Sequence, residues 1–302
     1  MKRLVLLSAI LLSGCSVKRY AINQLGNALA GTGTTFSADD DPELIRAAVP
    51  FSLKLVESLL AENPRHEGLL LAAARGFTQY AYAFVQEDAD ELEDTNKVAA
   101  TAMRARAAKL YLRARNYGLR GIEVKHPGFA ERLQANPKEA VKALKKSDVP
   151  LMYWTAISWG AALSASHDFA MLPEIPRFEA LLDRVMEVDE AYDEGTVHTF
   201  MITYEMVRLN GKGDLAARAA RAKEHFDRAI ALGGGHQAAP LVSYAENVLV
   251  RQKNKTEFQE MLRGALRIDI NASPETRQLN LAAQRRARWL LSRTDKLFPA
   301  PS

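Results

Sequence analysis

Apolar residues recur at helical spacing along most of the chain. Leu44, Ala48, Phe51, Leu55 and Leu59, for example, follow one another at three or four positions, which is the period of one helix face. No stretch offers convincing period-two alternation of apolar and polar residues with β-branched side chains, the pattern typical of strands. The sequence therefore predicts an all-α fold.

Start and stop signals divide this pattern into helices. Asp41 and Pro42 supply an N-cap acid and a proline at the first helical position, and Asn136 and Pro137 open another helix in the same way. The glycines at 233 to 235 end a helix. Helices are expected near 42–62, 67–87, 96–120, 137–146, 151–168, 176–189, 195–210, 215–232, 237–252, 255–268 and 275–296.

The expected helices also pair into units. The tetratricopeptide pattern places a small residue, an aromatic and another small residue on one helix face, so that two helices approach closely and the aromatic fills the gap between them. Two helices carry this pattern well, with Ala107, Tyr111 and Ala114 in one and Ala222, Phe226 and Ala229 in the other. We expect stacked antiparallel helical hairpins that resemble tetratricopeptide repeats, an α-solenoid-like fold, with an irregular bundle as the alternative.

The first residues have the organisation of a bacterial lipoprotein signal. Lys2 and Arg3 precede an apolar run over 4–12, which is too short to span a bilayer. Leu12, two small residues and Cys15 then form the pattern that lipoprotein signal peptidase reads. We expect cleavage before Cys15 and a lipid anchor on its sulfur, with an ordinary signal peptide and a chance cysteine as the alternative.

These signals predict three segments. Residues 1–14 are the signal peptide, 15–40 the lipidated N-terminus and tether, and 41–302 a single helical domain. Ser16 rather than aspartate follows the cysteine, which in a Gram-negative cell favours the outer membrane over the inner one. We therefore expect a periplasmic protein anchored to the outer membrane, with the inner membrane as the alternative.

Composition excludes some classes of protein. Without Lys2 and Arg3, the chain contains 38 basic and 36 acidic side chains, so the net charge of the mature chain is near +2. This balance argues against a nucleic-acid partner. Cys15 is the single cysteine, so no disulfide framework exists and stability must come from packing.

No set of polar residues has the spacing of an active site. Ser166, His167 and Asp168 have the residue types of a catalytic triad, but adjacent residues cannot face one another as a triad requires. The six histidines, at 66, 126, 167, 198, 225 and 236, lack metal-ligand spacing. We predict no catalytic residue, no metal and no cofactor.

Charged runs are interpreted as solvated surface. The acidic residues between 87 and 94 lack the central glycine of a calcium loop and are expected in a loop between helices. The basic run from Arg104 to Lys125 is expected on the outer face of a long helix, with an acidic partner as the alternative, and Arg285, Arg286 and Arg288 are interpreted in the same way.

Aromatic side chains crowd two of the expected helices. One contains Phe77, Tyr80 and Phe84, and the other contains Tyr153, Trp154 and Trp159. Core packing explains most of them, although a buried tyrosine or tryptophan needs a partner for its hydroxyl or N–H. Together they would also suit a groove for an elongated apolar or amphipathic ligand.

The lipoprotein signal and these aromatic helices carry a family resemblance. Segments 51–55, 76–84, 153–154 and 158–162 resemble the TRAP transporter T-component family, and the resemblance runs over nearly the whole mature chain. It implies a periplasmic lipoprotein that forms a homotrimer and works beside the solute-binding protein of a tripartite ATP-independent periplasmic (TRAP) transporter. It also implies a cleft or pore for an apolar ligand, and it supplies no catalytic residues.

We therefore expect an accessory binding module, and not an enzyme. It would dock the solute-binding protein and handle a hydrophobic small molecule in a cleft formed by Phe77, Tyr80, Phe84, Tyr153, Trp154 and Trp159. The alternative is a tetratricopeptide-like scaffold for envelope or outer-membrane assembly with no small ligand. A filled core without a groove beside Tyr80 or Trp159 would favour the scaffold. A hydrolytic enzyme would need a buried acid or histidine within reach of a nucleophile.

Overall fold

The computed structural model describes residues 23–31, 33–166, 168–208 and 214–299, and the predicted signal peptide and Cys15 lie outside these residues. The described part of the chain is helical and contains no strand, which confirms the predicted all-α class. None of its helices is both long and apolar enough to cross a membrane.

The described chain begins with a helical stretch at 23–30. The α-helices that follow are α2 (Gly33–Ser37), α3 (Pro42–Glu62), α4 (Glu67–Ala81), α5 (Glu87–Leu92), α6 (Lys97–Lys125), α7 (Phe129–Ala135), α8 (Pro137–Val141), α9 (Val149–Ser166), α10 (Ile175–Asp189), α11 (Thr196–Val207), α12 (Leu215–Leu232), α13 (Ala239–Tyr244), α14 (Lys255–Arg267), α15 (Arg277–Ser292) and α16 (Thr294–Leu297). Two π-helical turns, η1 (Tyr82–Gln86) and η5 (Ala245–Leu249), interrupt them, and four 3₁₀ turns connect them, namely η2 (Lys146–Asp148), η3 (Phe169–Glu174), η4 (Tyr192–Gly195) and η6 (Pro274–Thr276).

Local capping explains why several helices begin where the sequence predicts. The side chain of Asp41 accepts hydrogen bonds from the backbone N–H groups of Glu43 and Leu44, both at 3.0 Å, and α3 spans the expected 42–62. Asp214 likewise accepts from the N–H of Ala217 at 3.0 Å, and α12 spans the expected 215–232. Each cap satisfies a donor that the first helical turn leaves free.

The helix expected at 67–87 continues further than the sequence predicts. After α4 the chain passes through the π-helical turn η1 and continues as α5 to Leu92. Most of the acidic run that was expected in a loop is therefore helical, and that prediction was wrong. The short helix α7 and both π-helical turns were also not predicted.

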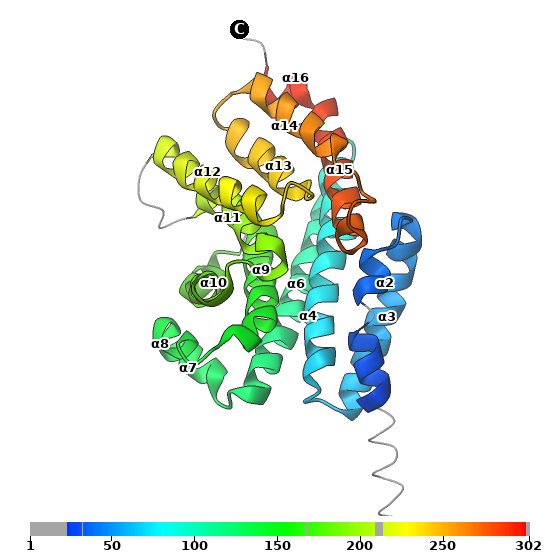
Figure 1. Ribbon diagram of the computed structural model, residues 1–302, viewed down its shortest axis with the longest axis vertical. Coiled ribbons are helices and arrows are strands. Elements are labelled where there is room, and N and C mark those ends of the chain that lie inside the picture. Colours follow the sequence, from blue (N-terminus) through cyan, green and yellow to red (C-terminus); the bar gives the residue numbers. More distant parts are fainter. Residues whose placement is uncertain (1–22, 32, 167, 209–213, 300–302) are drawn as a thin grey trace, which may run out of the picture.

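Helices α4, α6 and α9 lie side by side at the centre of the molecule (Figure 1). Phe77 of α4 stacks on Tyr117 of α6, with ring centroids 6.0 Å apart, whereas Tyr80, later in α4, meets Arg106, earlier in α6. The two helices are therefore antiparallel, as expected for a helical hairpin.

Helix α9 approaches α6 closely because α6 presents glycines to it. A Cβ atom on Gly118 would lie 2.1 Å from Oγ1 of Thr155, and one on Gly121 would lie 2.5 Å from a methyl carbon of Leu151. Side chains larger than hydrogen at these positions would push the two helices apart. The order of these pairs also makes α6 and α9 antiparallel.

The apolar side chains form separate cores in the two parts of the molecule. One extends over α3, α4, α6, α9 and α10 and includes Met201 and Tyr204 of α11. The other extends over α12 to α15 and includes Ile202 and Met206 of α11. Helix α11 therefore contributes to both cores, and we call the two parts the N-terminal and C-terminal halves.

Helix α15 returns to the beginning of the described chain. It lies beside α2 and α3 (Figure 1), and the side chain of Gln278 donates a 2.7 Å hydrogen bond to the backbone oxygen of Asp39. Arg277 similarly donates to the backbone oxygen of Ala38. Residues 33–39 of the segment expected as a tether thus pack on the C-terminal half, whereas Asn23, earlier in that segment, accepts a hydrogen bond from Asn63 after α3.

Candidate functional site

The six aromatic candidates lie on neighbouring elements. Phe77 and Tyr80 belong to α4 and Phe84 to η1, while Tyr153, Trp154 and Trp159 belong to α9, which packs against α4. Phe77, Tyr153, Trp154 and Trp159 are buried, and Tyr80 and Phe84 are partly exposed. Four of the six therefore contribute to the core.

The polar atoms of two buried candidates are already satisfied within the chain. The Tyr153 hydroxyl lies 2.8 Å from Oγ1 of Thr196, and the Trp159 indole N–H donates to Oε2 of Glu174 at 2.6 Å. Burial raises the pKa of Tyr153, so this hydroxyl keeps its proton at neutral pH. These internal partners are the ones that buried tyrosine and tryptophan were expected to need.

An arginine lies over five of the six rings. The guanidinium carbons lie 4.8–5.8 Å from the ring centroids, in the pairs Arg46 and Phe84, Arg75 and Trp154, Arg106 and Tyr80, Arg113 and Phe77, and Arg115 and Trp159. This distance is typical of a cation–π contact. The faces of these rings are therefore covered by charged side chains.

The basic run on α6 supplies three of these arginines. Arg115 also pairs with Glu174 at 2.9 Å, and Arg104 pairs with Asp90 at 2.9 Å. Arg113 pairs with the largely buried carboxylate of Glu57. The interpretation of this run as a solvated face was wrong for the partly buried Arg104 and Arg115, which hold α6 against its neighbours, whereas Arg113 remains exposed.

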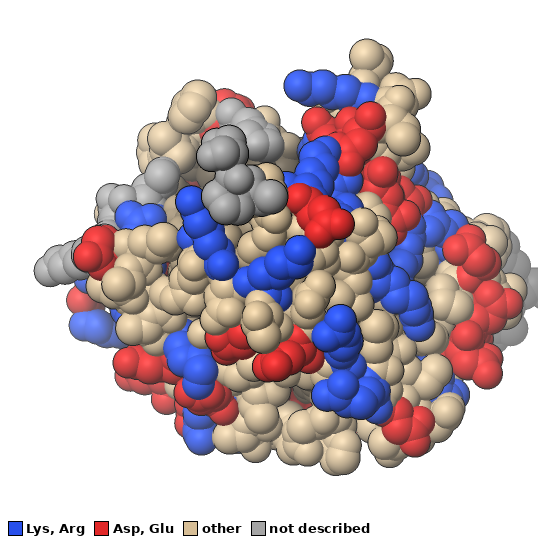
Figure 2. Space-filling model, turned by 90° about the horizontal axis from the view of Figure 1, so that it is seen from above, with Lys and Arg blue, Asp and Glu red and all other residues tan. Residues whose placement is uncertain are grey.

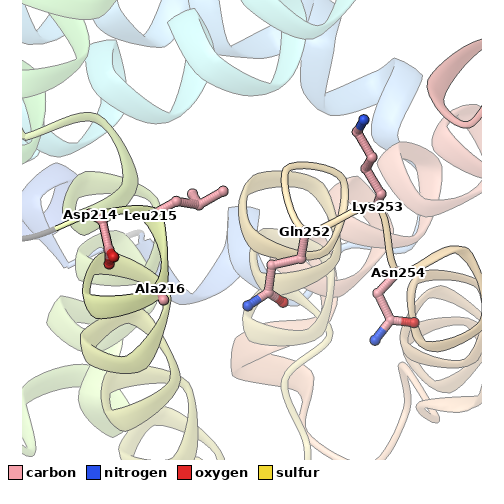
Figure 3. A pocket seen from close by; sticks show the side chains of 6 residues that line it. All are labelled: Asp214, Leu215, Ala216, Gln252, Lys253 and Asn254. Atoms are coloured by element: carbon pink, nitrogen blue, oxygen red, sulfur yellow. The ribbon is translucent and has the colours of Figure 1, made fainter.

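None of the six aromatic side chains lines either of two hollows that open on the surface of the described residues. The larger, about 780 Å³, is lined by Asp214, Leu215, Ala216, Gln252, Lys253 and Asn254. The smaller, about 370 Å³, is lined by Asn23, Asn27, Asn63, Arg65, His66, Glu67 and Gly68. The larger hollow lies between the start of α12 and the turn before α14 (Figure 3).

Only some of the side chains that line the larger hollow are available to contact a ligand. Asp214 and Asn254 cap α12 and α14 through hydrogen bonds to backbone N–H groups. In Figure 3 the side chain of Leu215 extends from α12 and that of Lys253 from the opposite wall into the open space. An apolar group and a cation on opposite walls suit an elongated molecule with an anionic end.

Two of the histidines meet in the structure although their spacing gave no sign of it. Nδ1 of His198 lies 2.9 Å from Nδ1 of His225, and Nε2 of His198 lies 3.2 Å from Glu190. Burial lowers the pKa of His225 to about 4 and also lowers that of His198, so both rings are neutral at pH 7. The described residues contain no group of three side chains that could hold a metal ion.

The acidic residues from Asp88 to Asp94 form ion pairs with other parts of the chain. Their partners are Arg46, Arg104, Arg285, Arg286, Arg293 and Lys296. Arg285 and Arg286 were therefore wrongly interpreted as a solvated face. The sequence offered only a weak signal, namely acidic residues and arginines in helices almost 200 positions apart. Figure 2 shows that charges of both signs are also interspersed on the face seen from above.

Comparison with known proteins gives two matches over almost the whole chain. The family described as "TRAP transporter T-component" matches residues 38–298, which include every helix from α3 to α16. A protein of Treponema pallidum (strain Nichols), described as an uncharacterized protein, is 30% identical over 310 residues, which cover 96% of this chain and 95% of that protein.

Proposed function

Because the chain belongs to the TRAP transporter T-component family, we propose that it is a periplasmic, lipid-anchored accessory protein that docks the solute-binding protein of a TRAP transporter. The family match over residues 38–298 is the observation that carries this proposal. It supports an accessory role in TRAP transport, and the docking step is our own inference from a body of helical hairpins that exposes side faces to a partner.

Anchoring through Cys15 is the second part of the proposal. Its support is the order of a basic start, a short apolar run and Leu-Ser-Gly-Cys. Cys15 lies eight positions before Asn23, the first described residue, and an extended chain over eight positions reaches at most about 28 Å. Acylation at Cys15 would therefore hold the helical body close to the membrane. We further propose that the body assembles as a homotrimer.

Co-purification tests anchoring and docking together. The tagged chain should fractionate with membranes and retain a TRAP solute-binding protein, identified by mass spectrometry, over a range of salt concentrations. The Cys15→Ser variant should leave the membrane fraction but still retain this protein, because docking depends on the folded body. Sedimentation of the same variant measures whether it is a trimer.

Two results would contradict the proposal separately. Absence of any solute-binding protein at all salt concentrations would reject docking. A mature chain without an acyl group on Cys15, as measured by mass spectrometry, would reject the lipid anchor. Neither result would change the family to which the chain belongs.

Handling of a hydrophobic solute is the third part of the proposal. Buried Phe77, Tyr153, Trp154 and Trp159 would support the wall of a cleft, whereas the partly exposed Tyr80 and Phe84 could contact a ligand directly. The larger hollow, with Leu215 and Lys253, is the better candidate for a first contact. The absence of the six aromatics from the lining of either hollow favours the alternative of a scaffold without a small ligand.

A fluorescent polyene fatty acid distinguishes these alternatives. Excitation of the tryptophans should give saturable energy transfer to the bound probe, and Leu215→Ser should weaken binding about tenfold, because loss of one apolar contact costs about 1.5 kcal/mol. Leu279→Ser is the matched control, since Leu215 and Leu279 are 45% and 43% exposed. The absence of saturable energy transfer would reject solute handling and favour the scaffold. Equal effects of the two substitutions would show that the solute does not bind in the larger hollow.

A further inference from the structure

The N-terminal and C-terminal halves meet a second time through charged side chains. Arg285 of α15 contacts Asp88 at 2.7 Å and Glu91 at 2.8 Å, and Arg286 contacts Asp90 at 3.1 Å. Arg293 and Lys296 both contact Asp94, at the end of the same acidic segment. We call these residues the clasp: Asp88, Asp90, Glu91 and Asp94 on one side, and Arg285, Arg286, Arg293 and Lys296 on the other.

Each side of the clasp is also held by its own half. Arg46 of α3 and Arg104 of α6 pair with Asp88 and Asp90, so two of the acids keep partners within the N-terminal half. On the other side, Arg286 pairs with Glu246 of η5 and lies 4.3 Å from the ring centroid of Trp289. Asp88, Asp90 and Arg286 would therefore keep a partner of opposite charge if the two sides separated.

The contacts between the two halves are apolar at α11 but consist of ion pairs at the clasp. At α11 both apolar cores use the same helix, whereas the two cores have no residue in common at the clasp. Clasp side chains such as those of Arg285, Glu91 and Asp94 are about one-third exposed. Ion pairs at that level of exposure are weakened by salt and contribute little stability individually.

Glu87 lies in the middle of the clasp without a hydrogen-bond partner. It is 2% exposed, and neither carboxyl oxygen has a partner within the described residues. The groups that act on it are Arg285 and Arg286 of α15, Glu246 of η5, Glu91 of α5, Tyr82 of η1 and Tyr111 of α6. Burial raises the pKa of Glu87 to about 8, and the two arginines only partly offset this effect.

We propose that the clasp is an opening point at which the two halves separate, with α11 as the pivot, in response to salt and pH. Separation exposes Glu87 to water and breaks the ion pairs that cross the clasp, including that between Arg286 and Asp90. The two apolar cores have no residue in common there, so they stay intact, whereas the hydrogen bonds of Arg277 and Gln278 to the backbone oxygens of Ala38 and Asp39 also break. The inference goes beyond the proposed function and does not depend on it.

The direction of the pH effect follows from Glu87. An exposed glutamate has a pKa near 4.5, so between that value and about 8 the closed form carries a proton that the open form lacks. Raising the pH through this window therefore favours opening. At the acid end, burial would raise the pKa of Asp88, but hydrogen bonds from Arg46 and Arg285 hold it below its usual range. The clasp thus also weakens when strong acid protonates its carboxylates.

Distances between spin labels measure the opening directly. In a Cys15→Ser chain, one label replaces Val98 in α6, which is 83% exposed, and the other replaces the exposed Arg288 in α15. At low salt and pH 6.5 we expect a single distance distribution. Raising NaCl to about 1 M, where the Debye length is about 3 Å, should add a longer population, and so should raising the pH to about 9 at low salt.

Two controls make the result specific. Labels at the exposed Arg263 and Arg288 both lie in the C-terminal half and should show no change under any of these conditions. Glu87→Gln should abolish the response to pH while leaving the response to salt. An unchanged distance between 98 and 288 would overturn the proposal, as would a shift of the control pair, which indicates unfolding. If the Glu87→Gln variant still responds to pH, Glu87 is not the group that causes the response.

Discussion

Replacement of Arg286 by alanine is expected to lower the free energy of unfolding by about 3–5 kcal/mol. Its side chain is 11% exposed and pairs with Glu246 and Asp90. Removal of one partner from a largely buried ion pair leaves charge without compensation, which costs this much in other proteins. The loss of Arg286 would leave Glu246 without this partner and close to the unpaired carboxyl of Glu87, whereas Asp90 keeps Arg104.

Arg288 offers a matched control in the same helix. It is two positions away and exposed, so Arg288→Ala should change the free energy of unfolding by less than about 0.5 kcal/mol. Urea denaturation of both variants at pH 7, followed by circular dichroism, gives the comparison, provided that the slope of the transition is unchanged. Equal midpoints for the two variants would show that Arg286 contributes no more to stability than the exposed Arg288.

Gly118→Ala is expected to destabilise the protein by about 2 kcal/mol, despite the better helix propensity of alanine. The new Cβ would lie 2.1 Å from Oγ1 of Thr155 and 3.2 Å from the Cα of that residue. Thr155 cannot turn away easily, because it is fully buried and its hydroxyl donates to the backbone oxygen of Leu151 at 2.6 Å. Overpacking of this kind costs about 1–3 kcal/mol.

The same substitution at Gly264 should have the opposite sign. A Cβ there would meet its nearest neighbour, a methyl carbon of Leu241, at 3.7 Å, which is an ordinary contact distance. Gly264→Ala in α14 should therefore raise the free energy of unfolding by about 0.5–1 kcal/mol through helix propensity alone. Melting temperatures that move in the same direction for both variants would contradict the close approach of α6 and α9.

The helices were predictable because their signals are local. Periodicity and capping residues fix the bounds of α3 and α12, and the small–aromatic–small pattern identified Ala107, Tyr111 and Ala114, all of which are buried between helices. The π-helical turns were not predictable in this way. Both η1 and η5 lie in helical stretches whose composition does not differ from that of ordinary α-helix.

The role of charged residues was the least predictable part. The acidic segment reads as solvent-exposed because its compensating arginines are almost 200 positions away, as in the pair Asp88 and Arg285. Arg113 similarly reads as a free surface charge, but it pairs with Glu57 and covers the ring of Phe77. Periodicity identifies which face of a helix is polar, but it contains no information on which distant helix that face meets.

The return of α15 to the beginning of the chain also determines the order in which the molecule can fold. Each helical hairpin joins neighbouring segments and can form as soon as its two helices exist, whereas the contact between Arg285 and Asp88 requires closure of a loop of 197 residues. Until the last helices are made, the N-terminal hairpins lack the basic partners of Glu91 and Asp94, and Asp88 and Asp90 have only those of their own half. Completion of the C-terminus is therefore the event that turns an open row of hairpins into a closed body.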